Sequence, residues 1–170
     1  MTQNMNQTFP VRPFLPADVA ALQELFAQSI DELCTEDYSD EQRLAWITRA
    51  EDRRAFGSRL AAMTTLVVQI GGDYAGFGAL KDNTKLDMLY VSPHYAGEGV
   101  GTALCDTLER LAGGRGATEI TVDSSETAVM FFEKRGYIAS SRNLMPVDDQ
   151  WLSNTTLVKK LGIQAAKTKA

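Results

Sequence analysis

Three glycines, Gly97, Gly99 and Gly101, occupy every second position of a short stretch near the middle of the chain. Glycine lets a backbone approach a ligand closely, and the first turn of a helix offers N–H groups without partners inside the helix. Apolar residues then repeat at helical spacing, at Val100, Leu104, Leu108 and Leu111. We therefore predict a phosphate cradle at the start of an amphipathic helix. A glycine-rich connection without a ligand is the alternative.

Two better-known glycine motifs do not fit this stretch. A P-loop needs Lys and then Ser or Thr after its last glycine, but Gly101 is followed by Thr102 and Ala103. A dinucleotide fingerprint that begins at Gly97 needs glycine at position 102, where this chain has Thr102. What remains is a strand, a short turn and a Gly-x-Gly sequence that enters a helix.

Composition and charge narrow the class of protein further. The chain has 170 residues with 44% hydrophobic and 23% charged residues, which suits one globular domain. Its net charge of −5 argues against nucleic acid as a partner. It has no apolar run of 18 residues and no leader-like amino terminus, so we expect a cytoplasmic protein that does not bind membranes. Its single histidine and two distant cysteines predict no metal site.

Strands and helices are predicted to alternate around the central strand, residues 86–91. Ser39 and Gln42 form a capping box, and Gly71-Gly72-Asp73 marks a hairpin. The predicted strands are 8–14, 65–70, 74–80, 86–91, 118–122, 137–142 and 155–161, with a turn at 146–150. The predicted helices begin near residues 18, 40, 51, 99 and 125. Residues 1–7 and 164–170 are predicted to be frayed.

Two sequence motifs in this order resemble those of the GNAT superfamily of acetyl-CoA-dependent N-acetyltransferases. The motif Arg/Gln-x-x-Gly-x-Gly/Ala corresponds to residues 96–101, with Ala96 in place of Arg or Gln and Glu98 where a basic residue is usual. The motif Asn-x-x-Ala-x-x-x-Tyr-Glu-Lys-x-Gly-Phe corresponds to residues 125–137, with Ser125 for Asn and Phe132 for Tyr. The amides of residues 97–102 would then carry most of the grip on a diphosphate.

This resemblance covers most of residues 9–138 and implies an α/β (α+β) fold. The expected GNAT architecture is a central mixed, mostly antiparallel sheet of about seven strands, splayed between strands four and five and flanked by about four to five helices. Residues 87–91, the segment 38–46 and the pair Phe131-Phe132 also look like the bacterial YafP-like branch.

The resemblance further implies that acetyl-CoA is the cofactor. The backbone of the central strand would pair with its pantetheine arm and polarise the thioester carbonyl, and the glycine turn would hold its diphosphate. The residues expected to bind it are Leu89, Tyr90, Val91, Gly97, Glu98, Gly99, Val100, Gly101, Thr102, Ser125 and Phe132.

For the chemistry, the resemblance implies direct attack by a primary amine of a small molecule or peptide. The amine must lose a proton, and we select Asp87 as general base because it shares strand parity with Leu89 and Val91. Glu32 and Glu36 are the reserves, and an anchoring role for Asp87 is the alternative. Phe132 has no proton to give where the family often has a tyrosine, so the thiolate would leave unassisted.

The acceptor would meet the segment between the first helix and the second strand, where Tyr38 and Trp46 are candidates for substrate contact. Trp46 could equally pack its helix onto the sheet. A homodimer is expected from the family. Two other functions stay open, namely a non-catalytic acyl-CoA-binding or regulatory module and an O-acetyltransferase.

Overall fold

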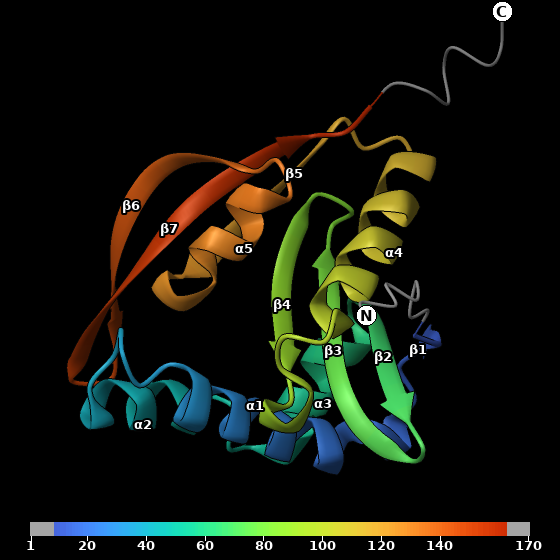
Figure 1. Cartoon of the computed structure of the whole chain (residues 1–170). Coiled ribbons are helices and arrows are strands. Elements are labelled where there is room, and N and C mark those ends of the chain that lie inside the picture. Colours follow the sequence, from blue (N-terminus) through green and yellow to red (C-terminus); the bar gives the residue numbers. More distant parts are fainter. Residues whose placement is uncertain (1–8, 163–170) are drawn as a thin grey trace, which may run out of the picture.

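The computed structural model describes residues 9–162, so the predicted frayed ends lie outside the described residues. Figure 1 shows the arrangement of the elements. The strands are β1 (Val11–Pro13), β2 (Thr64–Ile70), β3 (Asp73–Lys81), β4 (Lys85–Val91), β5 (Glu119–Ser125), β6 (Ile138–Val147) and β7 (Gln150–Lys160). The α-helices are α1 (Val19–Leu33), α2 (Asp40–Thr48), α3 (Arg53–Ala61), α4 (Val100–Gly114) and α5 (Val129–Lys134).

The seven strands form one mixed sheet in the order β1-β2-β3-β4-β5-β7-β6. Every neighbouring pair is antiparallel except β4 and β5, which are parallel. These two strands pair only at Lys85 with Thr121 and at Leu86 with Val122, and then they diverge (Figure 1). The predicted fold class, with its splay between strands four and five, is confirmed.

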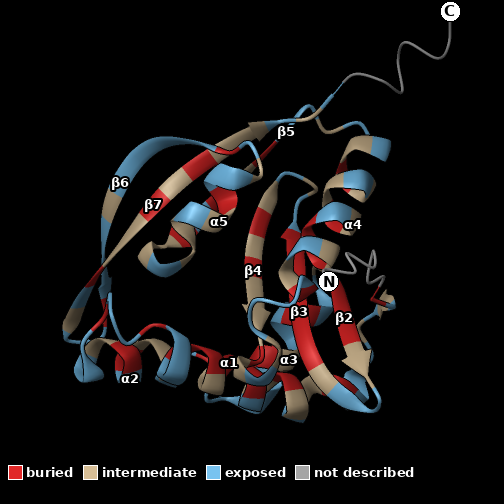
Figure 2. Cartoon of the chain, viewed as in Figure 1, coloured by how far each residue is buried: buried red, intermediate tan, exposed pale blue. Residues whose placement is uncertain are grey.

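Two apolar cores lie on opposite faces of this sheet. The helix α4 covers one face, where Leu104 and Leu108 are buried against the strands, and α1 and α3 cover the other face. Figure 2 shows that α4 and α1 carry buried residues, coloured red, next to the strands that they cover. In β3, a Cβ atom at Gly76 would lie 2.7 Å from the Val100 side chain, and one at Gly78 would lie 2.9 Å from the Leu108 side chain. These two glycines therefore allow α4 to pack closely against β3.

Local signals in the sequence set several element boundaries. Ser39 accepts a hydrogen bond from the N–H of Gln42, whose side chain caps Ser39 in return, so α2 begins at the predicted capping box. Gly71 and Gly72 have φ angles of 57° and 90°, which glycine adopts most readily, and they turn β2 into β3. The first strand is shorter than predicted, because its regular pairing ends at Pro13.

The carboxyl-terminal strands differ from the prediction. Residues 146–150 are not a separate turn, because β6 runs through Pro146 to Val147 and β7 begins at Gln150. Pro146 pairs with Trp151 on one side only, since β6 is the edge strand. An edge strand tolerates proline because one of its sides needs no N–H donor.

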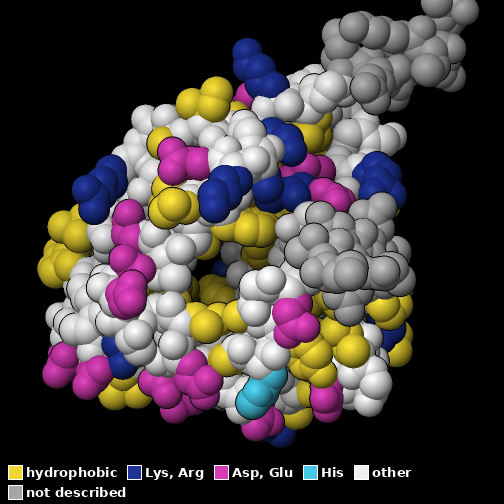
Figure 3. Space-filling model, viewed as in Figure 1, with side chains coloured by type: hydrophobic (Ala, Val, Ile, Leu, Met, Phe, Trp, Pro, Cys, Tyr) yellow, Lys and Arg dark blue, Asp and Glu magenta, His cyan; other side chains and the backbone are white. Residues whose placement is uncertain are grey.

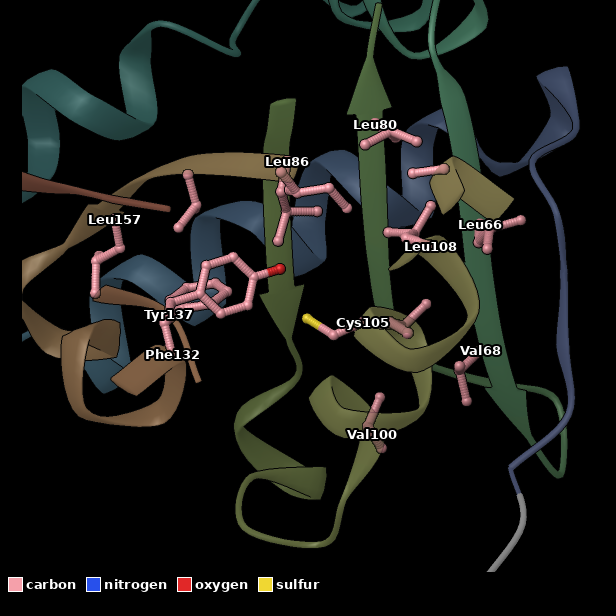
Figure 4. Close-up of a cluster of buried hydrophobic side chains, with 14 of the residues drawn as sticks. Leu66, Val68, Leu80, Leu86, Val100, Cys105, Leu108, Phe132, Tyr137 and Leu157 are labelled. Atoms are coloured by element: carbon pink, nitrogen blue, oxygen red, sulfur yellow. The ribbon is translucent and has the colours of Figure 1, made fainter. Parts of the chain in front are cut away.

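A charged cluster connects the two diverging halves of the sheet. Glu109 of α4 accepts hydrogen bonds from Tyr137 Oη at 2.8 Å, Lys159 Nζ at 2.8 Å and Arg135 Nη2 at 3.0 Å. Figure 4 shows Phe132 and Tyr137 facing Cys105 of α4 across the same core. Burial raises the pKa of Tyr137, so its hydroxyl remains a donor to Glu109. The cluster holds α4 to α5 and β7 where the strands do not pair.

A second buried charge anchors the first strand. The carboxylate of Asp18 is only 2% exposed. It accepts hydrogen bonds from both terminal nitrogens of Arg12, at 2.8 and 2.9 Å, from the N–H of Leu15 and from the hydroxyl of Tyr74. Arg12, with the help of the other donors, lowers the pKa of Asp18 to about 2 against the opposing effect of burial. The carboxylate is therefore ionised in the folded state at all but very acid pH.

We predict that this carboxylate makes stability depend on pH in a defined window. Its pKa is lower in the folded chain than the ordinary value of 3.8, so its contribution is present above pH 4 and is lost as the pH falls towards 2. Relative to Asp18→Asn, the wild type should lose about 2 kcal/mol of unfolding free energy between pH 4 and pH 2. Urea unfolding at a series of pH values measures this loss. The exposed control Asp149→Asn should follow the wild type, and parallel curves for wild type and Asp18→Asn would contradict the assignment.

Candidate active site

The divergence of β4 from β5 leaves backbone donors of β4 facing a gap. The N–H of Ser92, the residue after β4, donates to the carbonyl oxygen of Ala75 in β3 at 2.8 Å. Because successive residues of a strand direct their N–H groups to opposite neighbours, those of Leu89 and Val91 are directed away from β3. Neither residue has a partner in β5, whose pairing with β4 ends at Leu86. The gap therefore offers an edge to which an extended ligand could add as a strand.

The glycine turn lies between β4 and α4. Gly97 and Gly99 have φ angles of 77° and 96°, and Gly99 is the residue that caps α4. Gly99 has no side chain to satisfy the first N–H groups of the helix, and no side chain in residues 9–162 caps it instead. The helix thus begins where the sequence predicts, with Gly97 before it and Gly101 in its first turn.

These features fit a diphosphate. Unpartnered amides and the positive end of the helix dipole favour an anion at the start of α4. A Cβ atom at Gly97 would meet nothing within 4 Å, so its surroundings are open, whereas one at Gly101 would lie 3.4 Å from Phe131. Thr102 is exposed in the first turn, but the Val100 side chain is buried in the core, so only its backbone could contact a ligand. Ala96 and Glu98 are exposed and supply no cation.

Two adjoining hollows lie where β4 and β5 separate. The inner hollow, about 70 Å³, is lined by β4, β5 and the buried ring of Phe132. The outer hollow, about 200 Å³, lies towards α2, α3 and the β6–β7 turn. Figure 3 shows an opening with hydrophobic side chains around it in the middle of this face. The residues that line both hollows are Trp46, Leu86, Asp87, Tyr90, Asp123 and Ser125.

Wider depressions of about 590 Å³ each lie along α1. Glu24 lines both depressions, His94 lines one of them and Ile47 lines the other. Neither depression is lined by a residue of β4 or β5. The unpaired backbone of β4 distinguishes the smaller hollows as the candidate active site, since it supplies donors that the wider depressions lack.

Asp87 lies at the junction of the two hollows, but on a different face from the predicted one. The pairing of β3 with β4 passes from Leu86 to Met88, so Asp87 is a bulged residue without a partner on β3. Its Oδ2 atom accepts a hydrogen bond from Arg59 Nη2 of α3 at 2.8 Å. The predicted strand parity with Leu89 was wrong, because a bulge changes the alternation of side chains and turns Asp87 towards α3.

Tyr38 and Trp46 both line the outer hollow, and both also pack. The Tyr38 hydroxyl donates to the carbonyl oxygen of Ser153 at 2.7 Å and accepts from the N–H of Glu126 at 2.9 Å. Burial raises the pKa of Tyr38 to about 12. The Trp46 ring contacts the rings of Tyr38 and Tyr90, with centroids 5.4 and 6.3 Å away. Tyr38 is therefore held rigidly, whereas Trp46 is shared by the core and the hollows.

The side chain of Tyr90 was missed by the sequence analysis, which used only its backbone. Its ring packs against Phe26, with centroids 4.6 Å apart, and burial raises its pKa. Because the phenol lines both hollows, it is placed to contact an acceptor. The reserve bases Glu32 and Glu36 are exposed and line neither hollow.

The charged wall of the outer hollow was also missed. Lys85 Nζ lies 2.9 Å from Asp123 Oδ2, and Arg49 and Arg59 come from the ends of α2 and α3. Burial raises the pKa of Asp123, but the hydrogen bonds from Thr156 and Lys85 outweigh it, so that pKa is lower than usual. These residues are far apart in the sequence, and no local pattern signals that they converge.

Comparison with known proteins agrees with this geometry. Residues 34–153 match the Acetyltransferase (GNAT) domain family. The chain is 29% identical over 144 residues to the uncharacterized N-acetyltransferase YafP of Escherichia coli K12, covering 85% of this chain and 91% of YafP. The expected resemblance to that branch is confirmed.

Solved structures give the same result. A GCN5-related N-acetyltransferase from Rhodopseudomonas palustris is 46% identical, with a TM-score of 0.89 over 91% of this chain and 97% of that one. The PaiA N-acetyltransferase of Thermoplasma acidophilum, solved with coenzyme A, is 19% identical, with a TM-score of 0.70 over 91% of this chain and 99% of that one. The second comparison concerns the fold alone.

The chain belongs to the GNAT acetyltransferase family, whose members transfer an acetyl group from acetyl-CoA. The prediction that the protein is an acyltransferase is confirmed by this family membership. Within residues 9–162, no helix combines the length and the apolar character needed to cross a bilayer.

We predict that Glu98 weakens the binding of coenzyme A. Its carboxylate lies one residue before the cap of α4, where a negative charge opposes a bound diphosphate. Glu98→Gln should lower the Kd about two- to fivefold at low salt, corresponding to about 0.5–1 kcal/mol, and the gain should shrink as salt rises. Isothermal titration calorimetry measures it, with the exposed Glu119→Gln as control. An unchanged or higher Kd in Glu98→Gln would place the diphosphate elsewhere.

Proposed function

We propose that this protein transfers the acetyl group of acetyl-CoA to a primary amine of a small molecule or peptide by direct attack. The observation that carries the proposal is the position of Asp87 at the junction of the inner and outer hollows. A thioester placed in the inner hollow would meet an amine in the outer hollow beside a carboxylate.

The residues proposed for acetyl-CoA act through backbone and shape. Gly97, Glu98, Gly99, Val100, Gly101 and Thr102 would hold the diphosphate, and Leu89, Tyr90, Val91, Ser125 and Phe132 would border the pantetheine arm. When bound, acetyl-CoA supplies an activated acetyl group: a nitrogen–carbon bond forms while the carbon–sulfur bond breaks, and sulfur keeps the electron pair as a thiolate.

One backbone donor would stabilise the charge that develops on the carbonyl oxygen. The N–H groups of Leu89 and Val91 are directed into the gap, so we propose one of these two rather than that of Tyr90. A donor of this kind typically contributes about 3 kcal/mol to lowering the barrier. Because it is a backbone group, it is present without reorganisation when the thioester arrives.

Asp87 would remove the proton of the attacking ammonium, directly or through one water. An alkyl ammonium has a pKa near 10, so little free amine is present at neutral pH without a base. Only Oδ2 of Asp87 is engaged by Arg59 among the described residues, which leaves Oδ1 to face the acceptor.

We predict that Asp87→Asn lowers kcat/KM for a simple alkylamine by about 100-fold or more at neutral pH, because a general base typically contributes 10²–10⁴-fold. The Kd of acetyl-CoA should change little. Release of free thiol measures turnover, and Asp148→Asn in the β6–β7 turn is the matched control. Arg59→Gln breaks the same ion pair and keeps the base, so an equal loss in Asp87→Asn and Arg59→Gln would show that Asp87 only anchors Arg59.

Phe132 would shape the inner hollow and donate no proton. Coenzyme A leaves with a thiol pKa near 8.5, which allows departure as a thiolate that solvent protonates. We predict that Phe132→Tyr leaves kcat within about tenfold of wild type, because no acid is missing from the site. Steady-state kinetics measure this, and thermal unfolding checks the fold. A gain or loss of more than tenfold in a folded variant would show that this position takes part in proton transfer.

A non-catalytic acyl-CoA-binding module is the second candidate. Two observations favour it: Asp87 is engaged in an ion pair with Arg59, and Phe132 has no acidic proton to donate to the leaving thiolate. Binding of acetyl-CoA without thiol release across a panel of amines would support that module and contradict the enzyme. Transfer to a hydroxyl is the third candidate, and the same assay with alcohols tests it.

The homodimer stays a prediction. The edge strand β6 and its neighbour expose Ile138, Leu144 and Trp151, which are 74%, 63% and 58% accessible. An uncovered edge of this kind is suited to contact with a second copy.

A further inference from the structure

The charges around the outer hollow do not cancel. Its wall contains three cations, Arg49, Arg59 and Lys85, and two carboxylates, Asp87 and Asp123. Arg59 pairs with Asp87 at 2.8 Å, and Lys85 pairs with Asp123 at 2.9 Å. Arg49 forms no ion pair with any of residues 9–162. One uncompensated guanidinium therefore remains beside the proposed position of the acceptor.

This local excess is opposite in sign to the charge of the whole chain, which is −5. A chain that repels anions overall has a cation at the mouth of one hollow. Arg49 follows α2 directly, three residues after Trp46, and residues at this spacing lie on the same side of a helix. Arg49 is exposed, so an incoming ligand can reach its guanidinium without breaking a contact.

The rest of the wall is partly apolar and partly polar. Trp46, Tyr90, Met145, Val147 and Leu152 supply apolar surface, and the uncharged polar residues are Ser125, Ser153 and Asn154. The volume of about 200 Å³ is below the 300–1,000 Å³ usual for drug-sized ligands. The hollow thus suits a small molecule with an apolar body, and a polyamine would place additional positive charge beside Arg49.

We propose that the acceptor is an amphoteric amine, an amino-acid-like molecule whose carboxylate binds Arg49 while its ammonium group faces Asp87. A guanidinium binds a carboxylate through two parallel hydrogen bonds, which orients the ligand as well as attracting it. The apolar part of the acceptor contacts Trp46 and Tyr90. This inference rests on the proposed amine acetylation and narrows its substrate class.

The test compares amino acids with their amides in the wild type and three variants. Apolar amino acids and the corresponding amino acid amides, which carry the same amine but no carboxylate, are assayed with acetyl-CoA by mass shift and thiol release. The ratio of kcat/KM for acid over amide is measured in the wild type, Arg49→Gln and Arg110→Gln. Amides and acids differ in amine pKa, but this difference cancels when the ratio is compared between proteins.

We expect Arg49→Gln to lower the acid-over-amide ratio about tenfold, through a higher KM for the acid, since a charged hydrogen bond of this kind is lost. The control Arg110→Gln, an exposed arginine of α4, should keep the wild-type ratio. Arg49→Lys keeps the charge and should retain part of the preference.

A ratio that is the same in wild type and Arg49→Gln, with measurable turnover, overturns this inference and leaves amine acetylation standing. Faster acetylation of a polyamine than of any amino acid has the same consequence. Binding of acetyl-CoA without acetylation of any amine overturns the proposed function itself, and the inference with it.

Discussion

The structure depends on a sheet that stops pairing in its middle. The strands β4 and β5 share only two residue pairs, so the N–H groups of Leu89 and Val91 face a gap instead of a strand. Unpaired backbone inside a fold is costly unless a ligand or water satisfies it. The hydrogen bonds of Glu109 to residues of α5 and β7 compensate by holding the separated halves together on the side of α4. The gap is thus held open by the fold, and in the proposed function it receives the thioester.

The same divergence places the charged groups. The bulge at Asp87 turns its carboxylate to the face that holds α3, where Arg59 fixes it at the junction of the two hollows. In the proposed function, backbone groups serve acetyl transfer, while side chains from the ends of α2 and α3 and from β6 and β7 line the position of the acceptor. Under this proposal, side chains around the outer hollow can change the amine that is accepted without changing the glycine turn, which lines neither hollow.

Local patterns predicted much of this molecule. The capping box at Ser39, the hairpin at Gly71 and the glycines before α4 depend on near neighbours, and each lies where the sequence indicated. The bulge at Asp87 could not be predicted, since it arises from register against β3. Pro146 indicated a turn, but its place on an edge strand removed the need for its N–H. Arg49 and Arg59 line the same hollow only through tertiary packing, which leaves no local signal.

The central claim is that the amides of β4 and of the start of α4 bind acetyl-CoA together. Amide chemical shifts of the ¹⁵N-labelled chain, followed by NMR during titration with coenzyme A, test it most directly. We predict that the largest shifts occur at Leu89, Val91 and residues 97–102, and that they saturate with a single Kd. Saturable binding that shifts amides along α1 and leaves these residues unmoved would contradict the account.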